Sequence, residues 1–391
     1  MNILVLNAGS SSLKFKLFDA RSATEMNVLA NGAVDRIGTP QLSVRTSPGQ
    51  SGAVEVSAVH SMRDAAELVF QRLVPPPVGA IGYRVVHGGD RFEEPARITS
   101  EVVDDIVALS ELAPLHNAAA LDCIRAGQRL MPQTTAVAVF DTSFHRTLPE
   151  VARRYAIPRA LADQHHLHRF GFHGISHRYV SKQLLKCIGR SSPAGSRLIT
   201  CHLGNGASLC AIRDGKSIDT SMGLTPLEGL IMGTRSGDVD PGLVLHLMRV
   251  LKMSADDIDD LLNHRSGLLG LSGRSADVRD LENAAGAGDV NAQAALESFA
   301  YRCRKYIGAY AAALGGVDGI AFTGGIGEHS SGTRGRILRG LEFLGVTLDT
   351  QRNLSATGQS SISIGCGSVS VWVIPTDEER QVAEEVFRLC C

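Results

Sequence analysis

The chain has 391 residues, of which 44% are hydrophobic and 20% are charged, and its formal net charge at pH 7 is −1. The length favours two domains over a single core, and the composition is that of an ordinary globular protein. Because the charge is near neutral and no acidic or basic tail is present, we expect no nucleic-acid partner and no membrane-surface partner.

Targeting and redox signals both favour the cytoplasm. The N-terminus enters an apolar strand directly, without the basic and apolar regions of a secretory signal, and no apolar run approaches membrane-spanning length. The eight cysteines are scattered without CxxC spacing, and two of them are adjacent at the C-terminus. Because this is a poor framework for disulfides, we expect reduced thiols in a cytoplasmic protein.

The first predicted elements are two strands joined by a turn of small residues. Residues 3–6 form an apolar run, and residues 12–18 alternate between apolar and polar side chains. Asn7, Gly9 and three serines lie in and around the turn, so that backbone and hydroxyl groups could approach a phosphate. A plain hairpin turn is the alternative, because such turns are often built from the same residues.

The rest of the first half alternates strands and helices. Residues 28–60 are predicted to add strands to the first sheet, and residues 62–73 to form a helix before three prolines. Residues 79–89 look like a buried strand that ends in a loop presenting Arg84 and His87.

An amphipathic helix over residues 101–112 precedes the last strand of the first domain, residues 135–140. This strand is apolar throughout, which is typical of a buried parallel strand. Asp141 follows it, at the end of the strand where α/β sheets bind ligands. We place the domain boundary at residue 147, where the composition becomes polar and basic.

Five histidines crowd residues 165–177, just after this boundary. A metal site is one interpretation, but acidic and cysteine ligands are missing nearby and the spacing fits no standard site. A single catalytic histidine is the better interpretation. His173, which lies between Phe172 and Gly174 just before a predicted helix, is the best placed.

Residues 198–212 repeat the plan of the N-terminal hairpin, with Gly204 in the place of Gly9. Two such hairpins half a chain apart suggest a duplicated domain whose halves each direct a turn at a shared ligand. The loop over residues 225–242 contains four glycines and Arg235. Its length and composition predict contacts with a ligand or a neighbouring segment.

The C-terminal part is predicted to hold helices over residues 243–252, 255–263 and 289–314, with Asp277 to Arg279 in a connection. Apolar strands follow at residues 317–322 and 369–374. The first opens into a Gly-rich turn, Thr323-Gly-Gly-Ile-Gly-Glu-His329, that could bind phosphates or ribose through backbone N–H groups. A closing helix of about 380–391 is expected to pack back on the first domain.

These features together suit phosphoryl transfer. Such a reaction depends on positioning and on positive charge around the transferred group, usually with a divalent ion. Arg84 and Arg235, both predicted in Gly-rich loops, can bind carboxylate or phosphate through a planar fork. Surface ion pairs are the alternative role for both arginines.

Six motifs, in this order along the chain, together resemble those of the acetate kinase family. They are Asn7-Ala-Gly-Ser-Ser-Ser-Leu-Lys14, Arg84-Val-Val-His-Gly-Gly89, Phe140-Asp-Thr-Ser-Phe-His145, Gly171-Phe-His-Gly174, His202-Leu-Gly-Asn-Gly-Ala-Ser208 and Gly233-Thr-Arg-Ser-Gly-Asp-Val-Asp-Pro241. The resemblance implies an α/β fold of two duplicated actin-like (ribonuclease H-like) domains with a central cleft, in a homodimer. It also implies reversible, Mg²⁺-dependent transfer of the γ-phosphoryl group of ATP to acetate, giving acetyl phosphate and ADP, with Mn²⁺ as a possible substitute.

The resemblance also implies roles for particular residues. The catalytic residues would be Asp141, His173 and Arg235, and Asn7 and Glu378 would be the metal site. The acid would be bound by Arg84, Val86, Leu115, Phe172 and Pro226. The nucleotide would be bound by Lys14, His202, Leu203, Gly204, Asn205, Gly206, Asp277, Val278, Arg279, Gly325, Ile326, Gly327, Glu328 and His329. We expect Asp141 to steer Arg84 or the metal ion, because acetate is already ionised at neutral pH and needs no base.

Tyr83, His329 and Asp377 depart from the pattern of the family, where His, Asn and Asn are usual. Other functions also stay open from the sequence. A propionate kinase uses the same chemistry, since one methylene changes binding in an apolar pocket by only about 1–3 kcal/mol. A phosphohydrolase on the same fold, or a nucleotide-driven switch without acceptor chemistry, would keep the nucleotide motifs.

Overall fold

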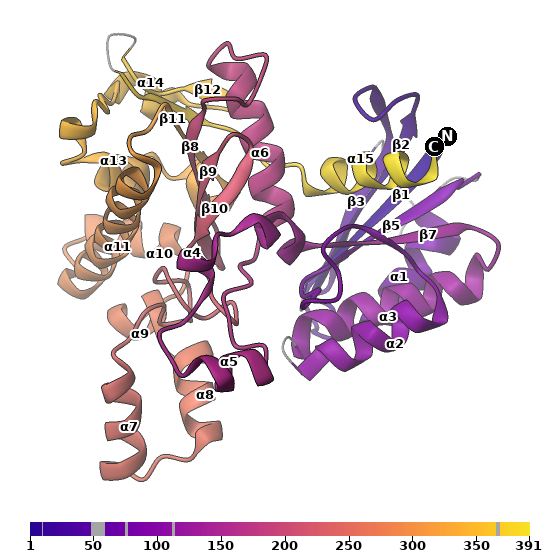
Figure 1. Cartoon of the computed structure of the whole chain (residues 1–391), viewed down its shortest axis with the longest axis horizontal. Helices are drawn as coiled ribbons and strands as arrows, with labels where there is room; N and C mark the ends of the chain where they lie inside the picture. The colour runs from indigo at the N-terminus through magenta and orange to yellow at the C-terminus, as the bar shows by residue number, and fades with distance from the viewer. Residues whose placement is uncertain (10, 48–58, 75–76, 112–113, 365–367) are drawn as a thin grey trace. The chain divides into compact units, whose positions relative to one another are not determined.

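The computed structural model describes residues 1–9, 11–47, 59–74, 77–111, 114–364 and 368–391, with the backbone alone at residues 111 and 114–116. The chain forms two compact units (Figure 1). Unit 1 contains Met1–Ser143 and Asp377–Cys391, and unit 2 contains Phe144–Thr376. The domain boundaries predicted from the sequence lie at residues 147 and 379. Both fall a few residues after the points at which the chain passes from one unit to the other.

Unit 1 is built on a seven-stranded sheet with the order β4-β3-β2-β1-β5-β7-β6. Its strands are β1 (Asn2–Ala8), β2 (Ser12–Ala20), β3 (Met26–Asp35), β4 (Ser43–Ser47), β5 (Ala80–Val85), β6 (Ala96–Arg97) and β7 (Thr135–Phe140). β1, β5 and β7 run parallel, and β2 and β3 continue from β1 in antiparallel pairs. The carboxyl ends of β1, β5 and β7 therefore meet at one edge of the sheet.

Helices cover both faces of this sheet (Figure 1). They are α1 (Met62–Leu68), the π-helix η2 (Val69–Leu73), α2 (Ser100–Ala108), the 3-10 helix η3 (Leu109–Glu111), α3 (Pro114–Leu130) and α15 (Glu378–Cys390). α1 and α3 bury the larger apolar core, whereas α15 packs on the other face against β1, β2 and β5. Gly82 in β5 permits this close packing, because a β-carbon there would collide with Val382 and Val386.

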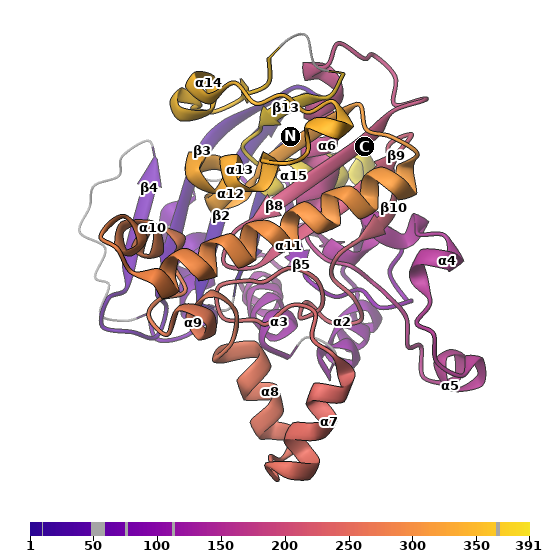
Figure 2. The ribbon, with the colours of Figure 1, turned by 90° about the vertical axis from the view of Figure 1, so that its left-hand side faces the viewer.

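Unit 2 is built on a six-stranded sheet with the order β10-β9-β8-β11-β13-β12. Its strands are β8 (Arg197–Leu203), β9 (Ala207–Arg213), β10 (Lys216–Thr220), β11 (Gly319–Thr323), β12 (Ser360–Ser361) and β13 (Ser370–Val373). The long helix α11 (Val290–Leu314) crosses one face, against β8 and β9 (Figure 2), and α6 (Gly174–Cys187) packs on β8 and β11.

The remaining helical segments of unit 2 are short. They are η4 (Asp141–Thr147, shared with unit 1), α4 (Glu150–Arg153), α5 (Arg159–Gln164), α7 (Pro241–Val250), α8 (Ala255–His264), α9 (Gly267–Ser272), α10 (Val278–Gly286), α12 (Gly324–His329), α13 (Ser331–Leu338), η5 (Glu342–Leu344) and α14 (Thr350–Ser355).

The two units repeat one topology, as the paired hairpins predict. In unit 1 the order β3-β2-β1-β5-β7 joins two antiparallel pairs to two parallel pairs. In unit 2 the order β10-β9-β8-β11-β13 has the same directions. This agreement confirms two α/β domains of duplicated topology.

Several local predictions are wrong. Arg84 lies inside β5, paired with Val139, rather than in a Gly-rich loop. Asp277 caps α10 with its side chain, so that Val278 and Arg279 begin a helix instead of lying in a connection. The Gly-rich stretch after β11 is itself the short helix α12. The prolines at 75–76 and part of the predicted strand region, residues 48–58, lie outside the described residues.

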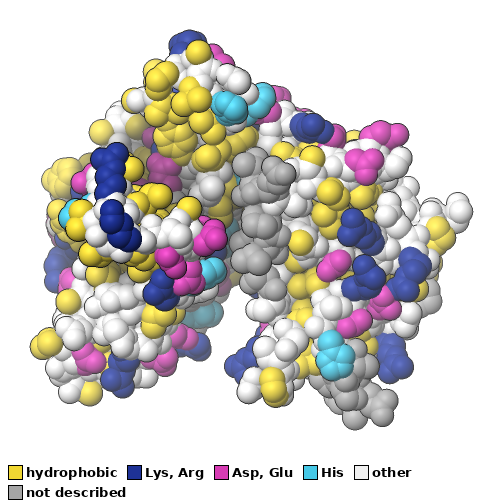
Figure 3. Space-filling view, turned by 90° about the horizontal axis from the view of Figure 1, so that it is seen from below, with side chains coloured by type: hydrophobic (Ala, Val, Ile, Leu, Met, Phe, Trp, Pro, Cys, Tyr) yellow, Lys and Arg dark blue, Asp and Glu magenta, His cyan; other side chains and the backbone are white. Residues whose placement is uncertain are grey.

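Within the described part of the chain, no helix is long and apolar enough to cross a membrane. On the face drawn in Figure 3, basic and acidic side chains are interspersed, in keeping with the formal net charge of −1.

Candidate active site

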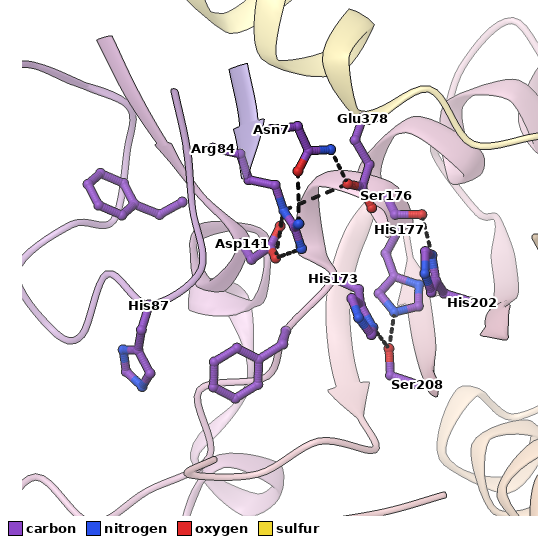
Figure 4. Close-up of polar contacts among 12 residues, drawn as sticks. Asn7, Arg84, His87, Asp141, His173, Ser176, His177, His202, Ser208 and Glu378 are labelled. Atoms are coloured by element: carbon purple, nitrogen blue, oxygen red, sulfur yellow. Dashed lines mark hydrogen bonds and ion pairs between the residues drawn. The ribbon is translucent and has the colours of Figure 1, made fainter. Parts of the chain in front are cut away.

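Four polar side chains of unit 1 meet at the carboxyl ends of its parallel strands (Figure 4). Asn7 is near the end of β1, Arg84 is near the end of β5, and Asp141 directly follows β7. Glu378 is the first residue of α15. The parallel arrangement of β1, β5 and β7 therefore brings together groups that are far apart in the sequence.

Arg84 is the centre of this cluster. Its Nη2 donates to Asp141 Oδ2 at 2.6 Å, its Nε donates to the same oxygen at 3.1 Å, and its Nη1 donates to Asn7 Oδ1 at 3.0 Å. Asn7 Nδ2 in turn donates to Glu378 Oε2 at 2.9 Å. The orientation of Arg84 is thus fixed by Asn7 of β1 and by Asp141, which follows β7.

Burial and charge act in opposite directions on Arg84. Burial disfavours its charged form, but the charges of Asp141 and Glu378 outweigh burial and raise the pKa of the guanidinium. Asp141 has no exposed surface. This arrangement favours a carboxylate that orients Arg84 over one that accepts a proton.

The oxygen atoms beside Arg84 suit a hard divalent cation. Asn7 offers an amide oxygen and Glu378 a carboxylate, and Mg²⁺ is usually held by one or two such protein groups together with waters and phosphate oxygens. Within the described ranges, no three His, Cys, Asp or Glu side chains are arranged to hold a metal ion by themselves. The donor types of Asn7 and Glu378 therefore match those that Mg²⁺ takes when waters and phosphate oxygens complete its coordination.

Lys14 is the cross-strand partner of Asn7 in the β1–β2 pair, and its side chain is exposed. It lines a surface cavity of about 270 Å³ with Lys16 and Arg45. Lys16 forms ion pairs with Asp377, at 2.7 Å, and with Glu379, at 3.4 Å. A nucleotide-binding role for Lys14 stays a prediction.

In unit 2, His173 occupies the N-cap position of α6 with a left-handed backbone, φ 56°. The preceding turn is held by His145, whose Nε2 lies 3.0 Å from the carbonyl oxygen of Phe172. Gly171 has φ 75° and no room for a β-carbon, which would collide with His145 and Thr220. A buried histidine and a glycine thus define the conformation of the turn.

Three residues lie beside the ring of His173, and two of them, Ser208 and His202, are labelled in Figure 4. Its Nδ1 lies 3.0 Å from Ser208 Oγ, and its ring stacks on that of His202 with 4.3 Å between the centroids. A β-carbon placed on Gly206 would lie 3.6 Å from both His173 Nε2 and Arg235 Nη1. His173 and Arg235 therefore both lie beside Gly206, which has no side chain.

Arg235 is a half-buried cation that has no partner of opposite charge among the described residues. Its Nη1 donates to the carbonyl oxygen of Pro226 at 3.0 Å, and within the described residues it forms no ion pair. Burial alone lowers the pKa of its guanidinium. A partly desolvated charge without an ion-pair partner is costly, so an anionic ligand is the expected partner.

The loop that carries Arg235 depends on glycines that sequence reasoning did not single out. Gly237 has φ 68° and lies against the backbone of residues 229–230, and Gly267, at the start of α9, lies against the backbone of Arg235. A side chain at either position would displace the loop. The sequence signal for Gly267 is weak, because it lies outside the recognised motifs.

A second cavity of unit 2, of about 570 Å³, is lined by most of the predicted nucleotide-binding segments. Its walls are Gly204, Asn205, Ala276, Asp277, Val278, Arg279, Glu282, Gly325, Ile326, His329 and Ser330. The hairpin turn after β8, the start of α10 and helix α12 thus converge, although they lie far apart in the sequence. A space of this size suits a nucleoside rather than a single phosphate.

Other residues of the predicted nucleotide set support this cavity without lining it. Leu203 is fully buried in β8, and the Glu328 carboxylate accepts hydrogen bonds from the backbone of Gly324 and Thr376. His202 Nδ1 lies 2.8 Å from Ser176 Oγ, within hydrogen-bond distance. Gly206 lies beside His173, and Gly327 lies beside β11.

Glu282 and Ser330 belong to the cavity wall and were not predicted. Ser330 Oγ donates to Glu282 Oε1 at 2.7 Å, and Arg336 lies 3.5 Å from the same oxygen. Glu282 lies one helical turn after Arg279 on α10. Recognition of that helix from the sequence would have placed it on the same face.

The residues predicted to hold the acid lie in both units. Val86 and Phe172 are buried, and Pro226 is half-buried beside Arg235. The side chain of Leu115 lies outside the described residues. That these residues line one apolar pocket stays a prediction.

Two of the positions that depart from the family pattern have a structural role. The Asp377 carboxylate caps α15 through Arg380 N and forms the ion pair with Lys16, while Tyr83 packs into the core beside α3. Because the Tyr83 hydroxyl has no hydrogen-bond partner in the described part of the protein, it does not support Arg84. His329 lines the cavity at the end of α12.

Comparison with known proteins agrees with the fold. The model of the acetokinase family matches residues 2–384. The acetate kinase of Phocaeicola vulgatus is 46% identical over 399 residues, which cover 100% of this chain and 99% of the relative.

Solved structures give the same result. The acetate kinase of Porphyromonas gingivalis has a TM-score of 0.86 and 40% identity, with 100% of both chains covered. A propionate kinase from Francisella tularensis has the same TM-score of 0.86 at 38% identity, with 98% of both chains covered. The chain therefore belongs to the acetokinase family.

Proposed function

We propose that this protein is an acetate kinase, which transfers the γ-phosphoryl group of ATP to acetate and gives acetyl phosphate and ADP. The observation that carries the proposal is the half-buried Arg235, which has no ion-pair partner among the described residues and lies with His173 beside Gly206. These groups form a site for a phosphoryl group next to a cavity large enough for a nucleoside.

In the proposed reaction, a carboxylate oxygen of acetate attacks the γ-phosphorus in line with the bond to ADP. The new bond joins this oxygen to phosphorus, and the bond from phosphorus to the β,γ-bridging oxygen breaks with its electrons on ADP. Arg235 and His173 donate to the equatorial oxygens, whose charge must be stabilised in the transition state. No general base is needed, because acetate is ionised at neutral pH.

Arg84 binds the carboxylate of the acid in this proposal, and Asp141 holds Arg84 in place. Support comes from the three hydrogen bonds that fix its guanidinium. Val86, Leu115, Phe172 and Pro226 would contact the methyl group. The cluster of Asn7 and Glu378 would hold Mg²⁺ or Mn²⁺, which neutralises phosphate charge when it is bound.

A coupled assay that traps acyl phosphate with hydroxylamine tests the proposal. Purified protein with MgATP and acetate is expected to form acetyl hydroxamate, and omission of acetate is expected to abolish most ADP formation. Absence of hydroxamate would reject the kinase. Release of ADP at an unchanged rate without any acid would favour the phosphohydrolase instead.

A propionate kinase is the second candidate, because a solved relative at 38% identity carries that description. Acetate and propionate differ by one methylene group. An apolar pocket discriminates between two such acids by only about 1–3 kcal/mol. Relative kcat/KM values for acetate, propionate and butyrate in the same assay separate the two candidates. The size of the cavity supports ATP over pyrophosphate as the donor.

A homodimer and a cytoplasmic location complete the proposal. α7 has no buried residue, and Leu243, Leu245 and Met248 are among its exposed apolar side chains, which suits a surface covered by a second copy. The described cysteines are all free, which suits a reducing compartment. Sedimentation velocity at micromolar concentration tests the dimer.

A further inference from the structure

A chain of hydrogen bonds runs from the interior of unit 2 to His173 (Figure 4). It begins at Thr200 in β8, whose Oγ1 lies 2.7 Å from His177 Nδ1. His177 Nε2 lies 2.8 Å from Ser208 Oγ, and Ser208 Oγ lies 3.0 Å from His173 Nδ1. None of these contacts was predicted from the sequence.

The inner part of this chain is closed to solvent. Thr200, His177 and Ser208 have no exposed surface. Burial, followed by the neighbouring His145 and His202, places the pKa of His177 well below its usual value. His177 is therefore neutral in the folded protein, and its ring carries a single proton.

The count of protons decides the direction of the chain. The hydroxyl of Thr200 has one hydrogen, and its hydrogen-bond partner is His177 Nδ1. If Thr200 donates, then His177 carries its proton on Nε2 and donates to Ser208 Oγ. The hydroxyl of Ser208 then donates to Nδ1 of His173, and every hydrogen in the chain has an acceptor.

The opposite direction leaves one hydrogen without a partner. In that case His173 Nδ1–H donates to Ser208, Ser208 donates to His177 Nε2, and His177 Nδ1–H donates to Thr200. The hydroxyl hydrogen of Thr200 would then be buried with no acceptor among the described residues. An unsatisfied buried donor costs enough to favour the first direction by about tenfold or more. A doubly protonated His173 meets the same obstacle, since its Nδ1–H also needs Ser208 as an acceptor.

We propose that Thr200, His177 and Ser208 are positioning residues that hold His173 as a neutral ring with its proton on Nε2. The inference rests on the proposed function, because it assigns the state in which His173 meets the phosphoryl group. Nε2 lies beside Arg235 at Gly206, so the fixed tautomer directs a hydrogen-bond donor to the same place as the guanidinium. In the other neutral tautomer a lone pair would face the phosphoryl oxygens and repel them.

Histidine-selective ¹⁵N NMR of the ligand-free protein tests this directly, with the His173 signals identified by their absence in His173→Gln. We expect a pyridine-type Nδ1 and a pyrrole-type Nε2 in the wild-type protein. A pyrrole-type Nδ1, or a doubly protonated ring at pH 7.5, would overturn the inference. The spectrum needs no turnover, so it stands apart from the hydroxamate assay, whose failure would reject the proposed function only.

Thr200→Val tests whether the Thr200 hydroxyl sets the tautomer of His173. The substitution keeps the shape of the side chain and removes the hydroxyl that donates to His177. We expect a mixture of His173 tautomers, with kcat reduced about tenfold and KM for ATP nearly unchanged, since one hydrogen-bond donor sets the preference. Thr200→Ser restores the hydroxyl and is expected to restore both readouts.

Thr333→Val is the matched control, because Thr333 is a buried threonine of the same unit whose hydroxyl has no hydrogen-bond partner among the described residues. It should leave the tautomer and kcat unchanged. An unchanged His173 spectrum in Thr200→Val would contradict the proposed role of the hydrogen-bond chain. Equal losses of kcat in Thr200→Val and Thr333→Val would contradict it as well.

Discussion

The guanidinium of Arg84 binds the carboxylate of Asp141 with two of its nitrogens, at 2.6 and 3.1 Å from Oδ2, at the carboxyl ends of β5 and β7. Asp141 is fully buried and the side chain of Arg84 is 14% exposed, so this pair is largely shielded from solvent. The geometry makes Asp141 the residue that sets the direction of Arg84, and it separates this role from that of a general base.

Asp141→Asn is therefore expected to lower kcat/KM for acetate by about 100-fold, because a misdirected Arg84 loses alignment with the acid. The loss should be similar at pH 6 and pH 8, since no proton transfer is removed. Asp122→Asn is the control, because Asp122 is a half-exposed carboxylate of unit 1 that lies 4.0 Å from Arg63 at the surface. A loss that disappears as the pH rises would instead indicate general-base catalysis.

Arg235→Ala is expected to lower kcat/KM by about 10²–10³, in line with the loss of a charged donor to the transition state. The free energy of unfolding should stay the same or rise, because the variant removes a half-buried charge that has no ion-pair partner in the described residues. Steady-state kinetics and urea unfolding provide the two measurements. Arg249→Ala on α7 is the matched control, and near-normal kinetics of Arg235→Ala would exclude the proposed role.

Tyr83 and Gly127 form a matched pair in the core of unit 1. A β-carbon on Gly127 would overlap the Tyr83 hydroxyl, and that hydroxyl has no hydrogen-bond partner within the described part of the chain. Gly127→Ala is expected to cost about 1–3 kcal/mol through overpacking. Tyr83→Phe should be neutral or stabilising by about 1 kcal/mol, because it removes an unsatisfied polar group.

The double variant gives the sharper result. Because loss of the hydroxyl makes room for the added methyl group, Gly127→Ala should cost clearly less in the Tyr83→Phe background. Chemical denaturation of the four proteins measures the coupling. Strict additivity of the two changes would show that the two side chains are not in contact.

The lowered pKa of His145 predicts that the protein becomes less stable at acid pH. Burial lowers the pKa of His145 to about 4 in the folded protein, against 6.5 in the unfolded chain. Between these values the unfolded chain binds a proton that the folded protein does not, so the stability is fully present above about pH 6.5 and is lost as the pH falls towards 4.

We expect protonation of His145 in the unfolded chain to lower the free energy of unfolding by about 2 kcal/mol between pH 7 and pH 5. His145→Gln keeps a donor for the carbonyl of Phe172 but does not titrate, so its unfolding free energy should fall less over that interval. His177 shifts in the same direction and remains in the variant. Parallel pH profiles for the wild-type protein and His145→Gln would contradict the assignment.

The fold and the order of its elements could be predicted from the sequence because the buried strands are apolar runs. Residues 135–140 became β7 without change, and the paired hairpins became β1–β2 and β8–β9. The Gly-rich segments at residues 202–206 and 323–329 were recognised from composition, and their convergence follows from the parallel strands that precede them.

Contacts between side chains of distant elements could not be predicted. Arg84 sits in a strand because its neighbours are apolar, yet its glycine-rich surroundings resembled a loop. The positions of Thr200, His177 and Glu282 depend on how α6 and α10 pack, which periodicity alone does not define. The role of Tyr83 depends on a glycine 44 residues away, beyond any local signal.

The central claim is that an oxygen of acetate attacks the γ-phosphorus of ATP, and an isotope experiment tests it most directly. The protein is incubated with MgATP and acetate labelled with ¹⁸O in both oxygens, and the acetyl phosphate formed is observed by ³¹P NMR. We predict an isotope shift of the acetyl phosphate signal, because one labelled oxygen then bridges carbon and phosphorus. Acetyl phosphate without that shift, or inorganic phosphate as the only new phosphorus product, would contradict the account.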